Sequence, residues 1–488
     1  MTTYDANGVT LEQVREFVWE IPQTGEMRVP ARVLASEALL DEISEDKTLE
    51  QITNTTHLPG ITNYAICMPD GHQGYGFPVG GVGAMDAEEG CISPGAVGYD
   101  INCGVRMMRT NLTYDDLRGR EEELVSSLFS NVPSGLGGGG IVESGVDTVE
   151  EILARGVDWA LEHGYAVEED LLNCEDEGMR EGADPSKVSQ KAKDRGKNQI
   201  GSLGSGNHFL EVQRVTDVFD DEVGDAYGLV EDQIVVLIHC GSRGLGHQTC
   251  NDYLRKIEKH HGGLLSRLPD KELAAAPAGS QLADDYYGAM NAAINFAWVN
   301  RQLIMHRTRE MFERVFDRSW ESMEMELLYD VAHNIAKKET HTIDDAGTER
   351  ELYVHRKGAT RAFPAGHPDV PRAYRDVGQP VIIPGSMGAG SYVLRGGDDS
   401  MALTFGSTAH GAGRLMSRTQ AKNEYWGGDV QQQLQDQSQI YVKAQSGATV
   451  AEEAPGVYKD VDEVVRVSDA LGIGDKVART FPICNIKG

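Results

Sequence analysis

The chain has 488 residues and a net charge of −31, from 76 acidic and 45 basic side chains. This is the wrong sign for a protein that binds nucleic acid through its overall charge, so either nucleic acid is not a partner or the acidity is a coat suited to high salt. Seven irregularly spaced cysteines argue against a disulfide framework and for a reducing cytosol.

We expect neither a membrane span nor a signal peptide. No run of about 18 apolar residues is present, so we expect no transmembrane helix. The first residues lack the basic and apolar regions of a signal peptide. The acidic stretch at 217–222 resembles a solvated coat, and we favour a halophilic source.

Residues 1–66 are predicted to be scaffold. A helix is expected over 10–18, with Thr10 as its N-cap and Gln13 in the capping-box position. A compact polar loop follows at 68–76. Its Asp70 and His72 are either site residues or an Asp-Gly turn with a surface histidine.

The stretch 98–106 holds an acid and a thiol three residues apart, Asp100 and Cys103, between glycines. If the chain turns between them, both side chains can aim at one point. This pattern is typical of a metal site or a catalytic thiol, and equally of a tight turn with a small buried cysteine.

The glycine run at 135–140 lacks the Gly-Lys-Ser/Thr ending of a phosphate-binding P-loop, so it is predicted to be a flexible loop. Helical periodicity covers 149–163, before Gly164. The segment 187–197 is then the one basic stretch of an acidic chain. It is either a solvated helix face or a surface that meets phosphates.

Histidines then follow small residues or buried strands. His208 ends a run of small residues, and His239 ends the predicted buried strand 233–238. A long helix is expected over 284–316, and His333 comes after it. A short basic strand and turn are expected at 354–360.

The C-terminal part adds two glycine-rich loops. The predicted strand 380–383 leads into the loop 385–390, whose backbone N–H groups could meet phosphate oxygens. His410 lies in a loop of Gly, Ala and Ser that leaves room beside its ring. No repeat or low-complexity linker divides the chain, so we expect one large α+β unit.

Asp100, Cys103, His208, His239 and His333 offer one carboxylate, one thiolate and three imidazoles. A single tetrahedral ion needs only four ligands, and a thiolate can bridge two ions, so the set suits a two-metal site. The mixed donors allow Mn, Zn, Fe or Co. With a histidine and two glycine loops, they favour nucleotidyl or phosphoryl transfer.

Several long motifs of the chain resemble the RtcB family of GTP-dependent RNA ligases. They are residues 69–76, 98–106, 204–211, 239–244, 333–334, 384–386 and 410–414. The resemblance implies one catalytic domain over 1–488, with mixed β-sheets surrounded by helices and a central metal and nucleotide cleft. It also favours an archaeal source.

The resemblance further implies a reaction. The family uses GTP and two Mn ions to join RNA 2′,3′-cyclic phosphate or 3′-phosphate ends to 5′-hydroxyl ends in tRNA splicing, with RNA repair as a second expected role. His410 would carry GMP, and the five predicted ligands would bind manganese, with Cys103 bridging. Archease, a small activating protein, partners many members. We expect a monomer or weak oligomer in the cytoplasm.

Guanylate-binding positions are carried over in the same way. They are Asn207, His208, Phe209, Leu210, Glu211, His333, Asn334, Pro384, Gly385, Ser386, Met387, Ser391, His410, Gly411, Ala412, Gly413, Tyr458 and Lys487. Glu211 and Lys487 are plausible readers of the guanine edge, since a carboxylate accepts and an ammonium donates hydrogen bonds. Tyr458 is expected to stack near the base.

Candidates for RNA phosphate contacts are Arg195, Lys197, Arg243, Arg414 and Arg418, with Lys187, Lys191 and Lys193 of the basic stretch. Two other readings stay open. One is a metal-dependent hydrolase of RNA cyclic phosphates that does not ligate, and the other is a non-catalytic RNA-binding protein.

Overall fold

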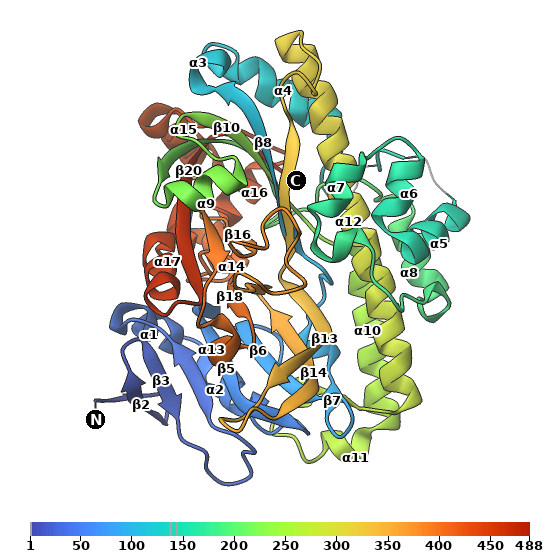
Figure 1. Cartoon of the computed structure of the whole chain (residues 1–488), viewed down its shortest axis with the longest axis vertical. Coiled ribbons are helices and arrows are strands. Elements are labelled where there is room, and N and C mark those ends of the chain that lie inside the picture. The colour runs from blue at the N-terminus through green and yellow to red at the C-terminus, as the bar shows by residue number, and fades with distance from the viewer. Residues whose placement is uncertain (1, 136–138, 143–144) are drawn as a thin grey trace.

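The computed structural model describes residues 2–135, 139–142 and 145–488. Two large mixed sheets form its centre and helices surround them (Figure 1), which confirms the α+β class. All seven cysteines lie in the described ranges, and they are free and buried. Among the residues that the structure describes, no helix has both the length and the apolar character needed to cross a membrane.

The first sheet is antiparallel except where β4 meets β5. In spatial order its strands are β1 (Thr3–Ala6), β2 (Val9–Arg15), β3 (Val18–Ile21), β4 (Ala31–Leu34), β5 (Ile61–His72), β6 (Val79–Asp86), β14 (Glu349–Lys357) and β13 (Asn334–Thr342).

The second sheet is antiparallel along its main path, and β19 (Tyr441–Ala444) pairs in parallel with one of its strands. In order the path is β12 (Glu326–Ala332), β8 (Gly104–Thr113), β10 (Gln233–Cys240), β9 (Phe209–Val218), β20 (Gly474–Lys487), β17 (Ser391–Gly396) and β16 (Pro380–Ile383). Two short ladders join β7 (Cys91–Ile92) to β11 (Ala276–Pro277) and β15 (Ala359–Arg361) to β18 (Ser407–Ala409).

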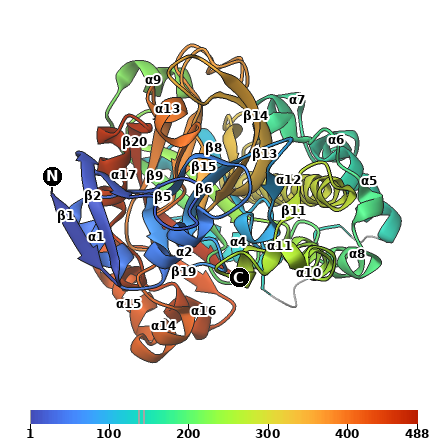
Figure 2. The same ribbon diagram turned by 90° about the horizontal axis from the view of Figure 1, so that it is seen from below.

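The helices cover the outside of the sheets, and α14 to α16 form a group of their own (Figure 2). Their bounds are α1 (Glu37–Ser44), α2 (Thr48–Thr55), α3 (Tyr114–Leu117), α4 (Glu121–Asn131), α5 (Val146–Arg155), α6 (Val157–Glu162), α7 (Glu168–Leu172), α8 (Gln190–Gly196), α9 (Asp221–Tyr227), α10 (Arg243–His260), α11 (Gly262–Leu265), α12 (Gln281–Phe316), α13 (Ser400–Thr404), α14 (Arg418–Glu424), α15 (Gly427–Ser438), α16 (Gly447–Glu452) and α17 (Val461–Ala470).

Helix α12 packs against strand β10 of the second sheet. The expected helix over 284–316 is confirmed, and it starts slightly earlier because the Ser280 side chain caps Ala283 N. The guanidinium of Arg301 reaches from α12 to both carboxylate oxygens of Asp330 on β12 and to the backbone oxygens of Asn102 and Cys240. One fully buried side chain of α12 therefore ties together the chain on either side of the predicted metal site.

The predicted strands 233–238 and 380–383 and the strand and turn at 354–360 are confirmed as β10, β16 and the β14–β15 segment. The helix expected over 10–18 is wrong. This stretch forms β2 and β3 with Phe17 in the left-handed region at φ 60°. Its β-branched residues and cross-strand pairs outweigh the local capping pattern.

The single helix expected over 149–163 is also corrected. Gly156, at φ 55°, divides it into α5 and α6. A Cβ at this position would lie 2.3 Å from the carbonyl oxygen of Gly178, so the close approach requires glycine. The loop predicted at 135–140 includes residues 136–138, which lie outside the described residues.

Candidate active site

Strand ends of the second sheet meet at one edge. Strand β8 begins where β10 and β12 end, because Gly104 pairs with both Cys240 and Ala332. Strand β9 begins at Phe209, which pairs with His239 on one side and Lys487 on the other. The residues at these strand ends therefore come together, and they include Cys103, His208, His239, His333 and Lys487.

The Asp100–Cys103 segment makes the turn that the sequence required. Cys103 N donates to Asp100 O at 2.9 Å. Asn102 takes the left-handed conformation at φ 50°, which Asn tolerates better than most residues. Its Nδ2 donates to Ile294 O and its N donates to Asn334 O. The turn is thus held from α12 and β13, with the acid and the thiol on the same side.

The five predicted ligands form two groups that share the Cys103 sulfur. One group is Cys103, His239 and His333, and the other is Asp100, Cys103 and His208; within each, the ligand atoms lie within 4.8 Å of one another. The Cys103 sulfur lies 3.1 Å from His239 Nε2 and 3.4 Å from His208 Nε2.

The other neighbouring ligand atoms within each group are also close to one another. His208 Nε2 is 2.8 Å from Asp100 Oδ2, and the Nε2 atoms of His239 and His333 are 3.3 Å apart.

Burial dominates the electrostatics of this cluster. Burial lowers the pKa of His239 and of His333 well below the usual value, and nearby cationic groups lower both further. Burial also raises the pKa of Cys103 to about 12, with Asp100 adding to the rise. For Asp100, burial acts upward, but the His208 charge and hydrogen bond lower the pKa to about 2.

This donor set fits a pair of metal ions. The Nε2 atoms of His239 and His333 are 3.3 Å apart, and the Cys103 sulfur lies 3.1 Å from His239 Nε2. Neutral imidazoles and a thiol this close point several lone pairs at one position, and a bound cation would satisfy them. The Nδ1 atoms of His208, His239 and His333 make no hydrogen bond to the protein. Imidazole, thiolate and carboxylate are ligands for Mn, Zn, Fe or Co, and a shared thiolate can serve two ions.

His410 lies directly beside this cluster, with its ring centroid 4.8 Å from that of His333. Its Nδ1 is 2.6 Å from Asp70 Oδ2, and the backbone N atoms of His410 and Gly411 donate to the same oxygen at 3.0 and 3.3 Å. Asp70 is fully buried. The carboxylate thus accepts from Nδ1 and leaves Nε2 as the ring nitrogen with a free lone pair.

A cavity of about 250 Å³ opens beside His410 and the metal-ligand candidates. Most of the predicted guanylate-binding residues line it. They are Asn207, Phe209, His333, Asn334, Pro384, Gly385, Ser386, Met387, His410, Gly411, Ala412, Gly413, Tyr458 and Lys487. The two glycine loops and the C-terminal strand therefore reach the same space.

Four predicted guanylate residues do not line the cavity, and one of them, His208, lies in the metal-ligand cluster instead. Leu210 packs into the hydrophobic core on the other face of β9, because side chains alternate along a strand. Ser391 Oγ accepts a hydrogen bond from Gly385 N and so supports the glycine loop. Glu211 is buried outside the cavity lining, and Gln213 and Asn485 donate to its carboxylate. Burial raises the pKa of Glu211 to about 7, although Lys487 acts to lower it.

The predicted phosphate-contacting cations differ in the groups of the protein that already contact them. Arg414 and Arg418 line the cavity. Arg414 is paired with the buried Glu453, and Arg418 lies 4.0 Å from Glu452 and donates to Asn207 Oδ1. Arg243 is buried, and its Nη2 donates to Gly135 O. On the basic stretch, Lys187 pairs with Asp285, Lys193 with Glu150 and Lys197 with Asp194. Arg195 is exposed and donates to the neutral amide oxygen of Gln248.

Among the lining residues that had no predicted role are Tyr99, Lys357 and Gly358. Lys357 Nζ donates to the carbonyl oxygens of Tyr75, Phe77 and Gly95 at 2.7 to 3.0 Å, so it holds neighbouring loops together. A signal was present, because Lys357 lies in the basic strand and turn at 354–360 and Tyr99 lies next to Asp100.

Comparison with known proteins gives matches to a single family over most of the chain. The family model described as tRNA-splicing ligase RtcB matches residues 51–488. A protein from Thermococcus kodakarensis with the name tRNA-splicing ligase RtcB is 57% identical over 481 residues, covering 98% of this chain and 99% of the relative. A protein of the same name from Aeropyrum pernix is 52% identical over 480 residues, with the same coverage.

Proposed function

Because the chain belongs to the RtcB family of tRNA-splicing ligases, we propose that it joins RNA 2′,3′-cyclic phosphate or 3′-phosphate ends to 5′-hydroxyl ends, with GTP as the energy source. One observation supports this above the others. A histidine with a free ring nitrogen lies against a cluster of metal-ligand candidates, inside one cavity with two glycine loops.

In the proposed first step, the Nε2 lone pair of His410 forms a bond to the α-phosphorus of GTP. The bond from that phosphorus to the bridging oxygen breaks, and pyrophosphate leaves with the electron pair. Asp70 holds the Nδ1 proton, so the lone pair stays on Nε2. The backbone N atoms of His410 and Gly411, which also donate to Asp70, fix the loop during attack.

GMP then passes from His410 to an oxygen of the RNA 3′-phosphate, and the N–P bond breaks. The 5′-hydroxyl of the second RNA attacks that 3′-phosphorus, loses its proton, and GMP leaves. A cyclic phosphate needs opening by water before this sequence. The balance is one GTP consumed and one phosphodiester, one GMP and one pyrophosphate formed.

Two manganese ions would be held by Asp100, Cys103, His208, His239 and His333, with Cys103 shared, and when bound they neutralise charge on phosphate oxygens. The cavity-lining residues around Pro384–Met387, Tyr458 and Lys487 would bind the guanylate together with the buried Glu211. We further propose that residues 1–488 form one catalytic unit, acting on tRNA halves and possible repair substrates in the cytoplasm with an archease-type activator.

The test is covalent labelling. With manganese and GTP labelled in the α-phosphate, the wild-type protein should form a GMP adduct that is stable in base and labile in acid, as a histidine phosphoramidate is. His410→Ala should form none, yet should still seal RNA that already carries a 3′-guanylylated end. His57→Ala, remote from the cavity lining, is the control and should label normally.

A GMP adduct mapped to another residue, or sealing of unactivated ends by His410→Ala, would contradict the proposal. A protein that opens cyclic phosphates but retains no covalent nucleotide would be the hydrolase alternative.

A further inference from the structure

An aromatic ladder leads from the cavity wall to the protein surface. Tyr99, next to Asp100, lines the cavity. Its ring stacks on His247, with centroids 4.9 Å apart and planes 25° apart, and the Tyr75 ring meets it edge-on at 5.4 Å. Tyr75 and Tyr99 are partly buried and His247 is exposed. The ladder is these three rings, and its outer ring faces solvent.

The outer ring is held as a neutral plane. Asn251 Nδ2, which can only donate, lies 3.1 Å from His247 Nδ1. Burial lowers the pKa of His247, and the neighbouring Arg195 lowers it further. His247 lies near the start of the 18-residue helix α10, so its backbone is fixed as well. A rigid neutral ring loses little entropy when another ring stacks on it.

A cation accompanies the ladder. Arg195 on α8 lies beside α10, and these two helices pack together (Figure 2). Its Nη1 donates to Gln248 Oε1 at 3.0 Å, and Gln248 directly follows His247. Since that partner is uncharged, the positive charge of Arg195 is not cancelled by it. Lys187 and Lys193 of the same stretch are paired with carboxylates instead.

Aromatic planes beside an arginine are the elements with which proteins hold single-stranded nucleic acid. Resting on the proposed function, we propose that the Tyr75–Tyr99–His247 ladder is the stacking platform for an unpaired nucleobase next to a reacting RNA end, with Arg195 facing its phosphate. The ladder starts at Tyr99, which lines the same cavity as Asp100, Cys103 and His410, so it would bring that end to His410 and the metal-ligand candidates.

The first experiment uses the wild-type protein with RNA that lacks one base. An abasic nucleotide is placed at the last position of either the 3′-phosphate strand or the 5′-hydroxyl strand, and sealing is measured under single turnover. Loss of a stacked base should raise the RNA concentration for half-maximal sealing roughly 5- to 150-fold for one of the two strands. The strand affected identifies which end the ladder holds.

The second experiment asks whether His247 is the platform. His247→Ala should weaken binding of intact RNA by a similar factor and should no longer distinguish intact from abasic RNA. His247→Phe keeps an aromatic plane and should restore the discrimination. His260→Ala, an exposed histidine at the far end of α10, is the matched control and should behave as wild type.

The outcomes separate this inference from the proposed function. A wild-type protein that seals RNA but treats intact and abasic ends alike would overturn the ladder proposal alone. So would a His247→Ala protein that keeps full discrimination. If His247→Ala misfolds, the wild-type abasic comparison and His247→Phe still decide. Failure of GMP labelling in the wild-type protein would overturn the proposed function itself.

Discussion

At the scale of single residues, the Cys103 sulfur is the atom on which both ligand groups depend. It is the one donor that belongs to both. Cys103 is buried, but its side chain is small. Replacing it by alanine therefore changes metal ligation far more than it changes packing. This separates a metal role from a structural one.

We predict that Cys103→Ala removes bound metal and abolishes ligation while the protein stays folded. The change deletes a shared ligand but leaves only a small void. Metal content by mass spectrometry, sealing rate and circular dichroism test this together. Cys250→Ala is the matched control, because Cys250 is also a buried free thiol but lies outside the ligand groups. Wild-type metal content in Cys103→Ala would exclude the bridging role.

Asp70 is the second residue whose role rests on one atom. Its Oδ2 accepts three hydrogen bonds from His410 and Gly411, including the short one from the ring. The buried carboxylate therefore selects which ring nitrogen of His410 carries the proton.

We predict that Asp70→Asn keeps its metal but forms the GMP adduct roughly 10²- to 10⁴-fold more slowly, as when an aspartate that orients a catalytic histidine is replaced by asparagine. An amide can turn its NH₂ toward Nδ1 and favour the unproductive tautomer. Stopped-time labelling with GTP gives the rate. Asp46→Asn, the same change in a carboxylate that accepts from Gln73 N in the neighbouring loop, should label normally. An unchanged labelling rate in Asp70→Asn would rule out this role.

At the scale of elements, neighbouring strands are tied by buried ion pairs. Glu339 on β13 accepts from both Nη atoms of Arg356 on β14 at 2.6 and 2.9 Å, and His341 Nε2 lies 2.9 Å from the same carboxylate. Burial alone would raise the pKa of Glu339, but Arg356 and His341 lower it well below the usual 4.5. The strands that begin and end at the site depend on this ionised group.

Because the folded-state pKa of Glu339 lies below its unfolded value, its contribution to stability is present above about pH 4.5 and is lost as the pH falls below that value. We predict that the unfolding temperature of the wild-type protein drops on acidification through this range. Glu339→Gln should be about 3 to 5 kcal/mol less stable at neutral pH, since it leaves Arg356 buried and unpaired, and should lose less on acidification.

The matched control is Glu351→Gln. Glu351 lies on β14 with its side chain 57% exposed and a Lys338 contact of 3.9 Å, so its removal should change little. An acid dependence that is identical in wild type and Glu339→Gln would contradict this assignment.

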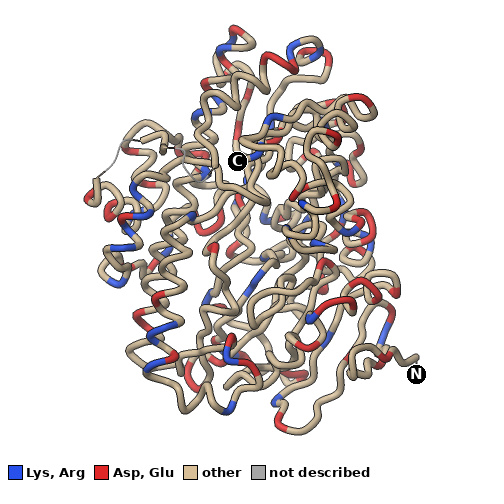
Figure 3. The backbone as a smooth tube through the Cα atoms, turned by 180° about the vertical axis from the view of Figure 1, so that it is seen from behind, with Lys and Arg blue, Asp and Glu red and all other residues tan. Residues whose placement is uncertain are grey.

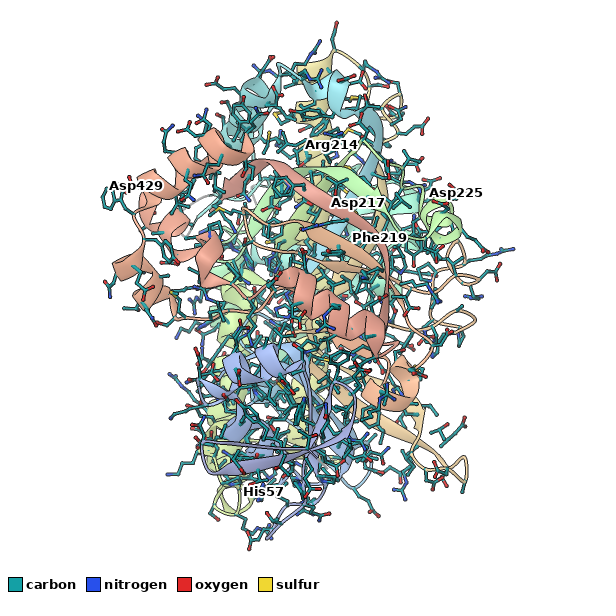
Figure 4. The ribbon with its side chains drawn as sticks, turned by 90° about the vertical axis from the view of Figure 1, so that its left-hand side faces the viewer. His57, Arg214, Asp217, Phe219, Asp225 and Asp429 are labelled. Atoms are coloured by element: carbon teal, nitrogen blue, oxygen red, sulfur yellow. The ribbon has the colours of Figure 1, made fainter. Side chains whose placement is uncertain are left out.

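At the scale of the whole molecule, acidic residues are spread along the backbone rather than confined to one segment (Figure 3). Asp217, Asp225 and Asp429 are exposed, and Figure 4 shows Asp225 and Asp429 at opposite sides of the molecule and Asp217 between them. This coat would repel RNA at low salt, where charges act over roughly 10 Å or more. The halophilic source that it suggests stays a prediction.

We predict that RNA affinity nevertheless falls as salt rises, because a few cations near the cavity would release counterions from the phosphates. Arg195→Gln and Arg418→Gln should each reduce the slope of log affinity against log salt by about one. Lys187→Gln should leave it unchanged, since Asp285 already neutralises Lys187. Binding is measured over the salt range in which circular dichroism is constant. Affinity independent of salt would reject phosphate contacts.

The sequence alone was enough to identify the family, the α+β class, the buried strands around His239 and Pro380–Ile383, and the residue types of the candidate ligands. These depend on short-range patterns: apolar runs, glycine spacing and long unusual motifs. Local patterns failed where tertiary contacts outweighed them. The stretch at 10–18 has a capping pattern but pairs into a sheet, and Gly156 breaks a periodic helix to let another strand of chain approach.

Only the tertiary structure decided which side chains share a point. Cys103, His208, His239 and His333 are separated by as many as 230 residues, and they meet because antiparallel strands start and end at one sheet edge. The same register turns Leu210 into the core and leaves Phe209 at the cavity. The partners of charged groups were equally hidden from sequence, since Lys187, Lys193 and Arg414 are alike as candidate phosphate contacts until each is seen with its carboxylate.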